Sequence, residues 1–254
     1  PYGGREDLHA GCLRCVGDPS KRFREDALRI MRGLRFSATL GFSIEAETAS
    51  AMYKEKNGLR NISKERINAE LSKLLMGEGA DLILRNHIEI LGTVATGIQL
   101  PQSDLKVLPK NLTVRLAEVF PKDTAYHLKA LKYDNHTIRN AGALSGLKGS
   151  PALTEPKREM LRFLQKHGEV ITELHYARAG EDALASLKAL LEEHPCYRME
   201  ELAISGTDLI KVGVHPGPKM GELLETLVDL VIEEKVENER NALMTAVKEA
   251  IRYE

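Results

Sequence analysis

Asp26 and Arg29 are the two side chains whose types and spacing point most clearly to chemistry. Residues 22–36 have helical period, and on one straight helix residues three apart are neighbours, so the carboxylate and the guanidinium would lie side by side. A carboxylate only accepts hydrogen bonds, whereas a guanidinium only donates them. Together they match the edge of cytosine or adenine, where an amino group stands beside a ring-nitrogen acceptor. They reject guanine and uracil, whose edges have the reverse order.

A solvated helix surface is a second interpretation of the same charges. Arg22 and Asp26 are four residues apart, and so are Glu25 and Arg29, so each pair can form an ion pair along a helix. Such pairs contribute only about 0.2–0.5 kcal/mol each, and spacing alone favours this interpretation. Gly33 stands one turn further along the same edge. A glycine there costs a helix up to about 1 kcal/mol, which suggests that another group approaches closely.

The longer string over residues 17–36, GDPSKRFREDALRIMRGLRF, changes that balance. It fills the pattern G-x-P-x-x-R-F-x-E-D-x-x-R-x-x-R-x-x-R-F and resembles the signature of class II tRNA nucleotidyltransferases (the family of CCA-adding enzymes) and bacterial poly(A) polymerases. Residues 63–75, SKERINAELSKLL, resemble the family's next motif. The resemblance covers residues 1–110 well and the rest loosely. It implies an enzyme that adds C and A to tRNA 3′ ends from CTP and ATP without a nucleic-acid template.

The resemblance assigns roles to individual side chains, position by position. Asp26 and Arg29 match the pair that reads the base of the incoming CTP or ATP. Arg32 and Arg35 match the next two arginines and would hold the nucleotide or fix its pocket. Arg35 lies further round the helix, so an ion pair within the protein is an alternative for it. Five more residues would support this nucleotide-binding segment: Arg22, Glu25, Arg66, Glu70 and Lys73.

The groups that catalyse phosphoryl transfer are expected elsewhere. The family holds Mg2+ with a Gly-Ser turn and a D-x-D pair in an N-terminal α/β head domain. No D-x-D occurs in the 254 residues, and the one Gly-Ser, at residues 149–150, has no carboxylate pair after it. We therefore expect this chain to lack the head except for a short remnant, to hold no catalytic or metal-binding residue, and to be inactive alone. Mg2+ would be bound by the head.

Several alternatives stay open at this stage. A relative that adds only A, only CC or a poly(A) tail would share the same motifs, because the deciding elements are expected in the head. A helical RNA-binding adaptor that has lost its catalytic domain is a further alternative. The oligomeric state is also open, with a homodimer among the alternatives.

A Gly/Pro turn near the C-terminus is a second candidate site. Residues 204–224, ISGTDLIKVGVHPGPKMGELL, resemble the C-terminal region of long bacterial CCA-adding enzymes, whose tail holds the tRNA elbow. Pro216, Gly217 and Lys219 would contact the tRNA backbone, because free N–H groups at a helix start and a nearby cation suit a phosphate. A plain connection between two helices is the alternative interpretation.

The elements that would position these residues are almost all helices. Helical period and cap residues predict an elongated all-α chain, with Ser63 and Ser205 as N-caps, an edge strand at residues 12–16 and a connector at residues 93–110. The predicted domains are a remnant of the α/β head (1–17), a nucleotide-recognition neck (18–80), a body (81–150) and a tRNA-binding tail (151–254). The expected helices span residues 22–38, 44–56, 63–76, 80–91, 112–120, 124–131, 136–144, 156–166, 170–179, 181–193, 204–211, 219–235 and 237–252.

Composition agrees with helices and argues against some classes of protein. Of the 254 residues 29% are charged and 5% aromatic, and the formal net charge is −1. Residues 18–36 hold six Lys or Arg against three Asp or Glu, whereas residues 219–254 hold five against nine, so an anionic partner should meet the N-terminal part. Three cysteines argue against a disulfide framework, and Cys12 and Cys15 have no second ligand pair for a metal. No apolar run reaches the roughly 20 residues of a membrane span, so a cytoplasmic protein is expected.

Overall fold

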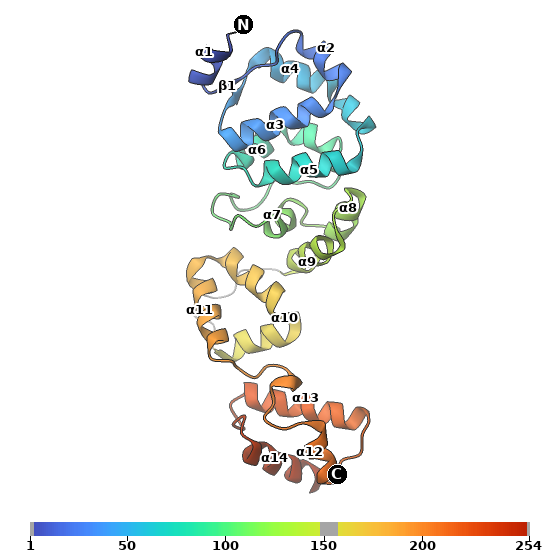
Figure 1. Ribbon diagram of the computed structural model, residues 1–254, viewed down its shortest axis with the longest axis vertical. Helices are drawn as coiled ribbons and strands as arrows, with labels where there is room; N and C mark the ends of the chain where they lie inside the picture. The colour runs from blue at the N-terminus through green and yellow to red at the C-terminus, as the bar shows by residue number, and fades with distance from the viewer. Residues whose placement is uncertain (1–2, 148–156, 253–254) are drawn as a thin grey trace. The chain divides into compact units, whose positions relative to one another are not determined.

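The computed structural model describes residues 3–147 and 157–252, which form an all-α structure with one small sheet (Figure 1). Contacts divide the chain into two units, Pro1–Gly149 and Ser150–Glu254. The predicted break at residues 146–151 lies largely outside the described residues. No helix in the described part of the chain is both long and apolar enough to cross a membrane.

The first unit opens with a short helix and a two-stranded sheet. α1 covers Gly4–His9, β1 covers Cys12–Leu13 and β2 covers Ser43–Ile44. The two strands run parallel, with Cys12 opposite Ser43. The predicted edge strand is thus present but shorter than expected. The sequence does not predict β2, because its two residues stand where a helix is expected to begin.

The segment that carries the candidate residues forms two helices, so the single helix predicted over residues 22–38 is wrong. α2 covers Pro19–Glu25 and α3 covers Leu28–Leu40. Between them Asp26 has φ −150° and ψ 100°, which is extended backbone. Its side chain accepts a hydrogen bond from the backbone N–H of Leu28 at 3.1 Å. The aspartate therefore helps to begin α3 instead of continuing α2, as short polar side chains tend to do at helix starts.

α3 lies at the centre of the first unit and packs against α5 and α6 (Figure 1). The elements that follow it are α4 (Ala46–Glu55), the 3-10 helix η1 (Lys56–Asn61), α5 (Lys64–Leu75) and α6 (Ala80–Gly92). Burying a Leu, Ile or Met side chain contributes about 1.5–3 kcal/mol, so this core fixes which face of α3 turns outward. The fully buried side chains at this centre include Ile30, Met31, Leu34, Leu71 and Leu74.

Three helices complete the first unit after the irregular connector that follows α6. They are α7 (Leu112–Val119), α8 (Thr124–Ala130) and α9 (Asn135–Gly146), and α9 packs against the other two. Arg115 of α7 is 1% exposed and donates to backbone carbonyl oxygens of neighbouring segments. Its charge is enclosed by the core, so Arg115 serves packing and is not available to a ligand.

The second unit has a core of its own, built from leucines and aromatic rings. α10 bends at Gly168, whose φ is 75°, so it consists of two helical segments, as the sequence predicts. The elements of this unit are α10 (Lys157–Ala179), α11 (Glu181–Glu192), the 3-10 helix η2 (Met199–Glu201), α12 (Gly206–Lys211), α13 (Pro218–Ile232) and α14 (Arg240–Arg252).

Both predicted N-caps are confirmed. The hydroxyl of Ser63 accepts a hydrogen bond from the backbone N–H of Arg66 at the start of α5. Ser205 and Asp208 form a capping box at the start of α12. These caps satisfy backbone donors that the helix itself cannot, which is why local sequence predicts them.

Candidate functional site

Four arginines surround one hollow in the first unit, and we call it the arginine hollow. It has a volume of about 340 Å³ and is lined by residues of β1, α2, α3 and α4 and of the segment after β1. Arg29 and Arg32 come from α3, Arg22 from α2, and Arg14 from the segment after β1. Aromatic and aliphatic side chains make up much of the remaining wall. Four positive charges around so small a space favour an anionic ligand.

Arg29 and Arg32 are the charges of the arginine hollow that no carboxylate neutralises. Both side chains are exposed. Neither forms an ion pair with any residue in the ranges 3–147 and 157–252. They stand three residues apart on α3, so their positive charges are neighbours on one helix edge.

The ion pairs that a continuous helix would form are absent from the described residues. Arg22 pairs with Glu25 at 2.8 Å, three residues on, within α2. The alternative pairs, Arg22 with Asp26 and Glu25 with Arg29, do not form there. The extended backbone at Asp26 ends the helical turn that would have brought each pair together.

Asp26 lines a second hollow, of about 490 Å³, which Arg29 does not line. One of its carboxylate oxygens accepts the N–H of Leu28, and the other lies 3.5 Å from a guanidinium nitrogen of Arg66. Arg66 therefore lies beside Asp26 from α5, a contact that the sequence does not predict. The expectation that Asp26 and Arg29 stand side by side along one helix edge is therefore wrong, because α2 ends before Asp26 and α3 begins after it.

Gly33 lies on α3 one turn beyond Arg29 and is buried. A Cβ atom at this position would overlap the Cε atom of Met52, a side chain of α4 that is 1% exposed. The glycine therefore makes room for Met52. The close approach suggested by the sequence is accounted for by a side chain of the core.

Arg35 does not line the arginine hollow and is held inside the protein. Its Nε atom lies 2.7 Å from Oε2 of Glu70 on α5, and the two side chains are 17% and 13% exposed. Its guanidinium also lies 3.9 Å from the centre of the Phe36 ring. This is the internal ion pair that the sequence leaves open as an alternative for Arg35. Lys73, further along α5, is exposed and has no ion pair with the residues described.

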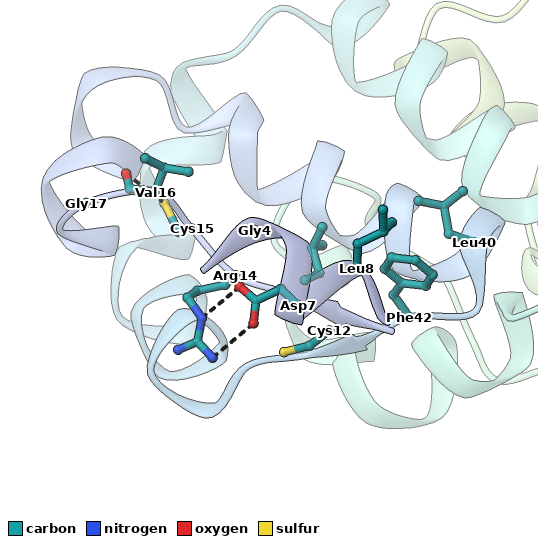
Figure 2. A pocket seen from close by; sticks show the side chains of 11 residues that line it. Gly4, Asp7, Leu8, Cys12, Arg14, Cys15, Val16, Gly17, Leu40 and Phe42 are labelled. Atoms are coloured by element: carbon teal, nitrogen blue, oxygen red, sulfur yellow. Dashed lines mark hydrogen bonds and ion pairs between the residues drawn. The ribbon is translucent and has the colours of Figure 1, made fainter. Parts of the chain in front are cut away.

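Arg14 is the candidate that the sequence misses. Its Nε and Nη2 atoms donate to the two carboxylate oxygens of Asp7 at 3.0 and 3.2 Å, as Figure 2 shows. Glu45 lies 3.6 Å from the same guanidinium. Arg14 also lines a neighbouring hollow of about 480 Å³, together with Leu8 and Leu40 (Figure 2). No motif marks Arg14, because its partners come from α1 and from the residue before α4.

Cys12 and Cys15 are free thiols beside these hollows. Burial raises the pKa of the Cys15 thiol, and the charges of Arg22 and Arg29 oppose that shift without cancelling it. No three His, Cys, Asp or Glu side chains of the described residues gather as the ligands of a metal ion would.

The turn at the start of α13 is exposed. Pro216, Gly217 and Lys219 all lie on the surface of the second unit, and Gly217 has φ 154°. Pro218 opens the helix and has no N–H, and the N–H of Met220 donates to the carbonyl oxygen of Gly217. The three predicted residues are thus together and accessible on one turn.

Two family models match the chain. The family described as "tRNA nucleotidyltransferase domain 2 putative" matches residues 111–247, which is more than half of the chain. The family described as "Probable RNA and SrmB- binding site of polymerase A" matches residues 41–88.

Relatives with the name CCA-adding enzyme match nearly the whole chain. The one from Anoxybacillus flavithermus is 34% identical over 96% of this chain and 64% of its own length. The one from Leuconostoc mesenteroides subsp. mesenteroides is 30% identical over 98% of this chain and 66% of its own length. The chain thus spans about two-thirds of the length of these curated relatives.

A solved structure has the same fold. The Bacillus stearothermophilus CCA-adding enzyme in complex with CTP matches with a TM-score of 0.78 and 27% identity, over 100% of this chain and 69% of that one. The family model over residues 111–247 and the relatives point to the same family that the signature at residues 17–36 resembles. The chain belongs to the tRNA nucleotidyltransferase family.

Proposed function

We propose that this chain is the nucleotide-selecting and tRNA-binding portion of a template-independent CCA-adding nucleotidyltransferase, with CTP, ATP and tRNA as its ligands. The observation that carries the proposal is the arginine hollow, where the exposed Arg29 and Arg32 have no carboxylate partner among the described residues. Relatives named CCA-adding enzymes, and a solved one in complex with CTP, support the same assignment.

Asp26 and Arg29 choose the base in this proposal. The base lies across the α2–α3 break, which separates the hollow of Asp26 from that of Arg29. One oxygen of Asp26 is held by the N–H of Leu28, while the other has only a long contact of 3.5 Å to Arg66. The Asp26 side chain is 31% exposed, so the amino group of cytosine or adenine can reach that oxygen. Arg29 donates to the neighbouring ring nitrogen, and such a paired contact discriminates by roughly 1–3 kcal/mol.

The remaining arginines hold the triphosphate and the shape of the site. Arg32 lies next to Arg29 on α3, so it meets phosphate oxygens of the same nucleotide, which guanidinium groups bind with two parallel hydrogen bonds. Arg22, oriented by Glu25, lines the same hollow. Arg35 fixes α3 against α5 through its ion pair with Glu70, and Arg66 of α5 lies beside Asp26.

The tail turn contacts the tRNA backbone through Pro216, Gly217 and Lys219, which lie exposed at the start of α13. The domain division proposed with this function is a head remnant (1–17), a neck that selects the nucleotide (18–80), a body (81–150) and a tail that binds tRNA (151–254).

Phosphoryl transfer itself belongs to residues outside this chain. The step needs divalent ions such as Mg2+ held by carboxylates, and no such cluster exists among the described residues. We therefore expect the chain alone to bind CTP without incorporating it. Steady incorporation by the 254-residue chain would contradict this part of the proposal.

The test of the function is nucleotide incorporation by a protein that contains this chain, on a tRNA ending at its discriminator base. CTP, ATP, UTP and GTP are supplied separately. The wild type should incorporate C and A and reject U and G, because only C and A offer an amino group to Asp26 beside a ring-nitrogen acceptor for Arg29. Asp26→Ala should lose roughly 5- to 150-fold of that discrimination.

The matched control is Asp182→Ala, since Asp182 is an exposed aspartate of α11 far along the chain. Its selectivity should equal that of the wild type. Full selectivity in Asp26→Ala would remove Asp26 from base reading. A wild type that incorporates all four nucleotides equally would end the proposal.

A further inference from the structure

α8 and α9 form another hollow in the first unit, lined by none of the residues of the arginine hollow. Its volume is about 520 Å³, and its lining includes Tyr126, one cation, Arg139, and one acid, Asp123. The two helices pack against each other, with Gly142 of α9 opposite Ala125 of α8.

Tyr126 has a large aromatic surface that the fold does not use. The side chain is 71% exposed. Its ring meets His127 edge to face, with 5.3 Å between ring centroids, and His127 stacks on the buried Phe120 at 5.9 Å. Gly97 leaves the space that the His127 ring occupies. Tyr126 is therefore supported by the packed core on one side and open to solvent on the other, which suits stacking on a flat ligand.

The segment that forms this hollow carries a net positive charge. Residues 121–147 contain two acidic residues, and one of them, Asp134, is occupied as the N-cap of α9, where it accepts hydrogen bonds from Thr137. The cations outnumber these acids, and none of them forms an ion pair within the ranges 3–147 and 157–252. The four exposed cations of α8, α9 and their flanks are Lys122, Lys129, Lys132 and Arg139.

We infer that the α8–α9 surface binds RNA, with Tyr126 stacking on an unpaired base and the four cations contacting the phosphates on either side. That this RNA is tRNA rests on the proposed function. Aromatic stacking combined with backbone cations is a general way for proteins to hold unpaired nucleotides without reading their sequence. A protein partner fits less well, because lysines are depleted from the centres of protein interfaces.

Equilibrium binding of the whole chain to tRNA at several salt concentrations tests this inference. The double variant Lys129→Ala, Arg139→Ala should bind more weakly, and the slope of log affinity against log salt should fall by roughly 1 to 2, because two phosphate contacts are lost. Tyr126→Ala should weaken binding by roughly 5- to 150-fold and leave the slope unchanged, because stacking releases no counterions. Tyr126→Phe keeps the ring and should bind like the wild type.

Lys106→Ala is the matched control, since Lys106 is an exposed lysine between α6 and α7 that has no ion pair among the described residues and does not line this hollow. CTP binding is measured on the same samples and should be unchanged in every variant. If Tyr126→Ala and the double variant both bind tRNA with the wild-type affinity and slope, the inference is overturned. The same holds if Lys106→Ala weakens binding as much as they do. A wild-type chain that binds tRNA but not CTP would instead count against the proposed function.

Discussion

Arg162 of the second unit differs from Arg29 and Arg32 of the first unit in what lies beside it. In the second unit Arg162 contacts two carboxylates, those of Asp229 and Glu233. On α3 of the first unit, Arg29 and Arg32 line a hollow with no ion pair to any described residue. The other arginines of the second unit with a polar partner among the described residues are Arg158, Arg178, Arg198 and Arg240.

This difference separates charges that hold the fold from charges that are available to a ligand. Arg162 joins α10 to α13 and to the residue after it, so its charge is used within the unit. Arg29 and Arg32 are like charges one turn apart, which costs a helix a few tenths of a kcal/mol, about as much as an opposite pair contributes. An anion bound between them removes that repulsion, so the pair gains from a phosphate or nucleotide.

Arg35 and Arg32 lie on the same helix and differ in whether their charge is used within the fold. Arg35→Ala should have the largest effect on stability of the variants considered. Arg35→Ala leaves the mostly buried Glu70 without its partner, so the free energy of unfolding should fall by about 2–3 kcal/mol, after allowance for partial exposure. Arg32→Ala, three residues away, should change it by less than about 0.5 kcal/mol. Urea unfolding of both variants measures this, and equal losses would erase the distinction.

Arg162 should have a smaller effect, confined to stability. Its side chain is 38% exposed, and solvent weakens its two ion pairs, so Arg162→Ala should lower the free energy of unfolding by about 1 kcal/mol. CTP affinity should not change, because Arg162 lies outside the arginine hollow. Thermal unfolding and CTP titration on one sample check both points. A loss of CTP affinity with unchanged stability would reverse the roles given to the two regions.

The parts of the fold that were predictable from the sequence have local causes. α5 and α12 begin where Ser63 and Ser205 predict, because each cap acts within three residues of itself. The helix break at Asp26 is different. The helical period of the sequence predicts that the helix continues through Asp26. In the structure Asp26 lies against Arg66, which is 40 positions away along the chain.

The same contrast applies to the candidate site. The family signature identifies the positions of Arg29 and Arg32, and the structure brings both to one hollow. It gives no sign of Arg14, whose orientation depends on Asp7 and Glu45. Motif spacing therefore indicates candidate residues, whereas contacts distant in sequence decide which hollow each one lines.

Asp208 gives the smallest expected effect, on the pH dependence of the second unit. Hydrogen bonds from Arg240 at 2.6 Å and from the backbone N–H of Ser205 at 3.1 Å hold the pKa of its carboxyl well below the ordinary value. A lowered pKa contributes stability that is complete above the ordinary value of about 3.9 and is lost as pH falls through the folded-state value. Asp208→Asn should therefore be less stable than the wild type near neutral pH, and the gap should narrow in acid. Urea unfolding near neutral pH and in acid measures the difference in stability between the variant and the wild type. An equal difference under both conditions would contradict this prediction.

The CTP affinity of the double variant Arg29→Ala, Arg32→Ala is the most direct test of whether the arginine hollow binds the nucleotide. The matched control is Arg60→Ala, since Arg60 is an exposed arginine of η1 that lines neither the arginine hollow nor that of Asp26. Each hydrogen bond to a charged group is worth about 1.5–3 kcal/mol, so the double variant should bind CTP at least roughly tenfold more weakly. The control should bind like the wild type. A double variant whose CTP affinity equals that of Arg60→Ala would contradict the assignment of this hollow to the nucleotide.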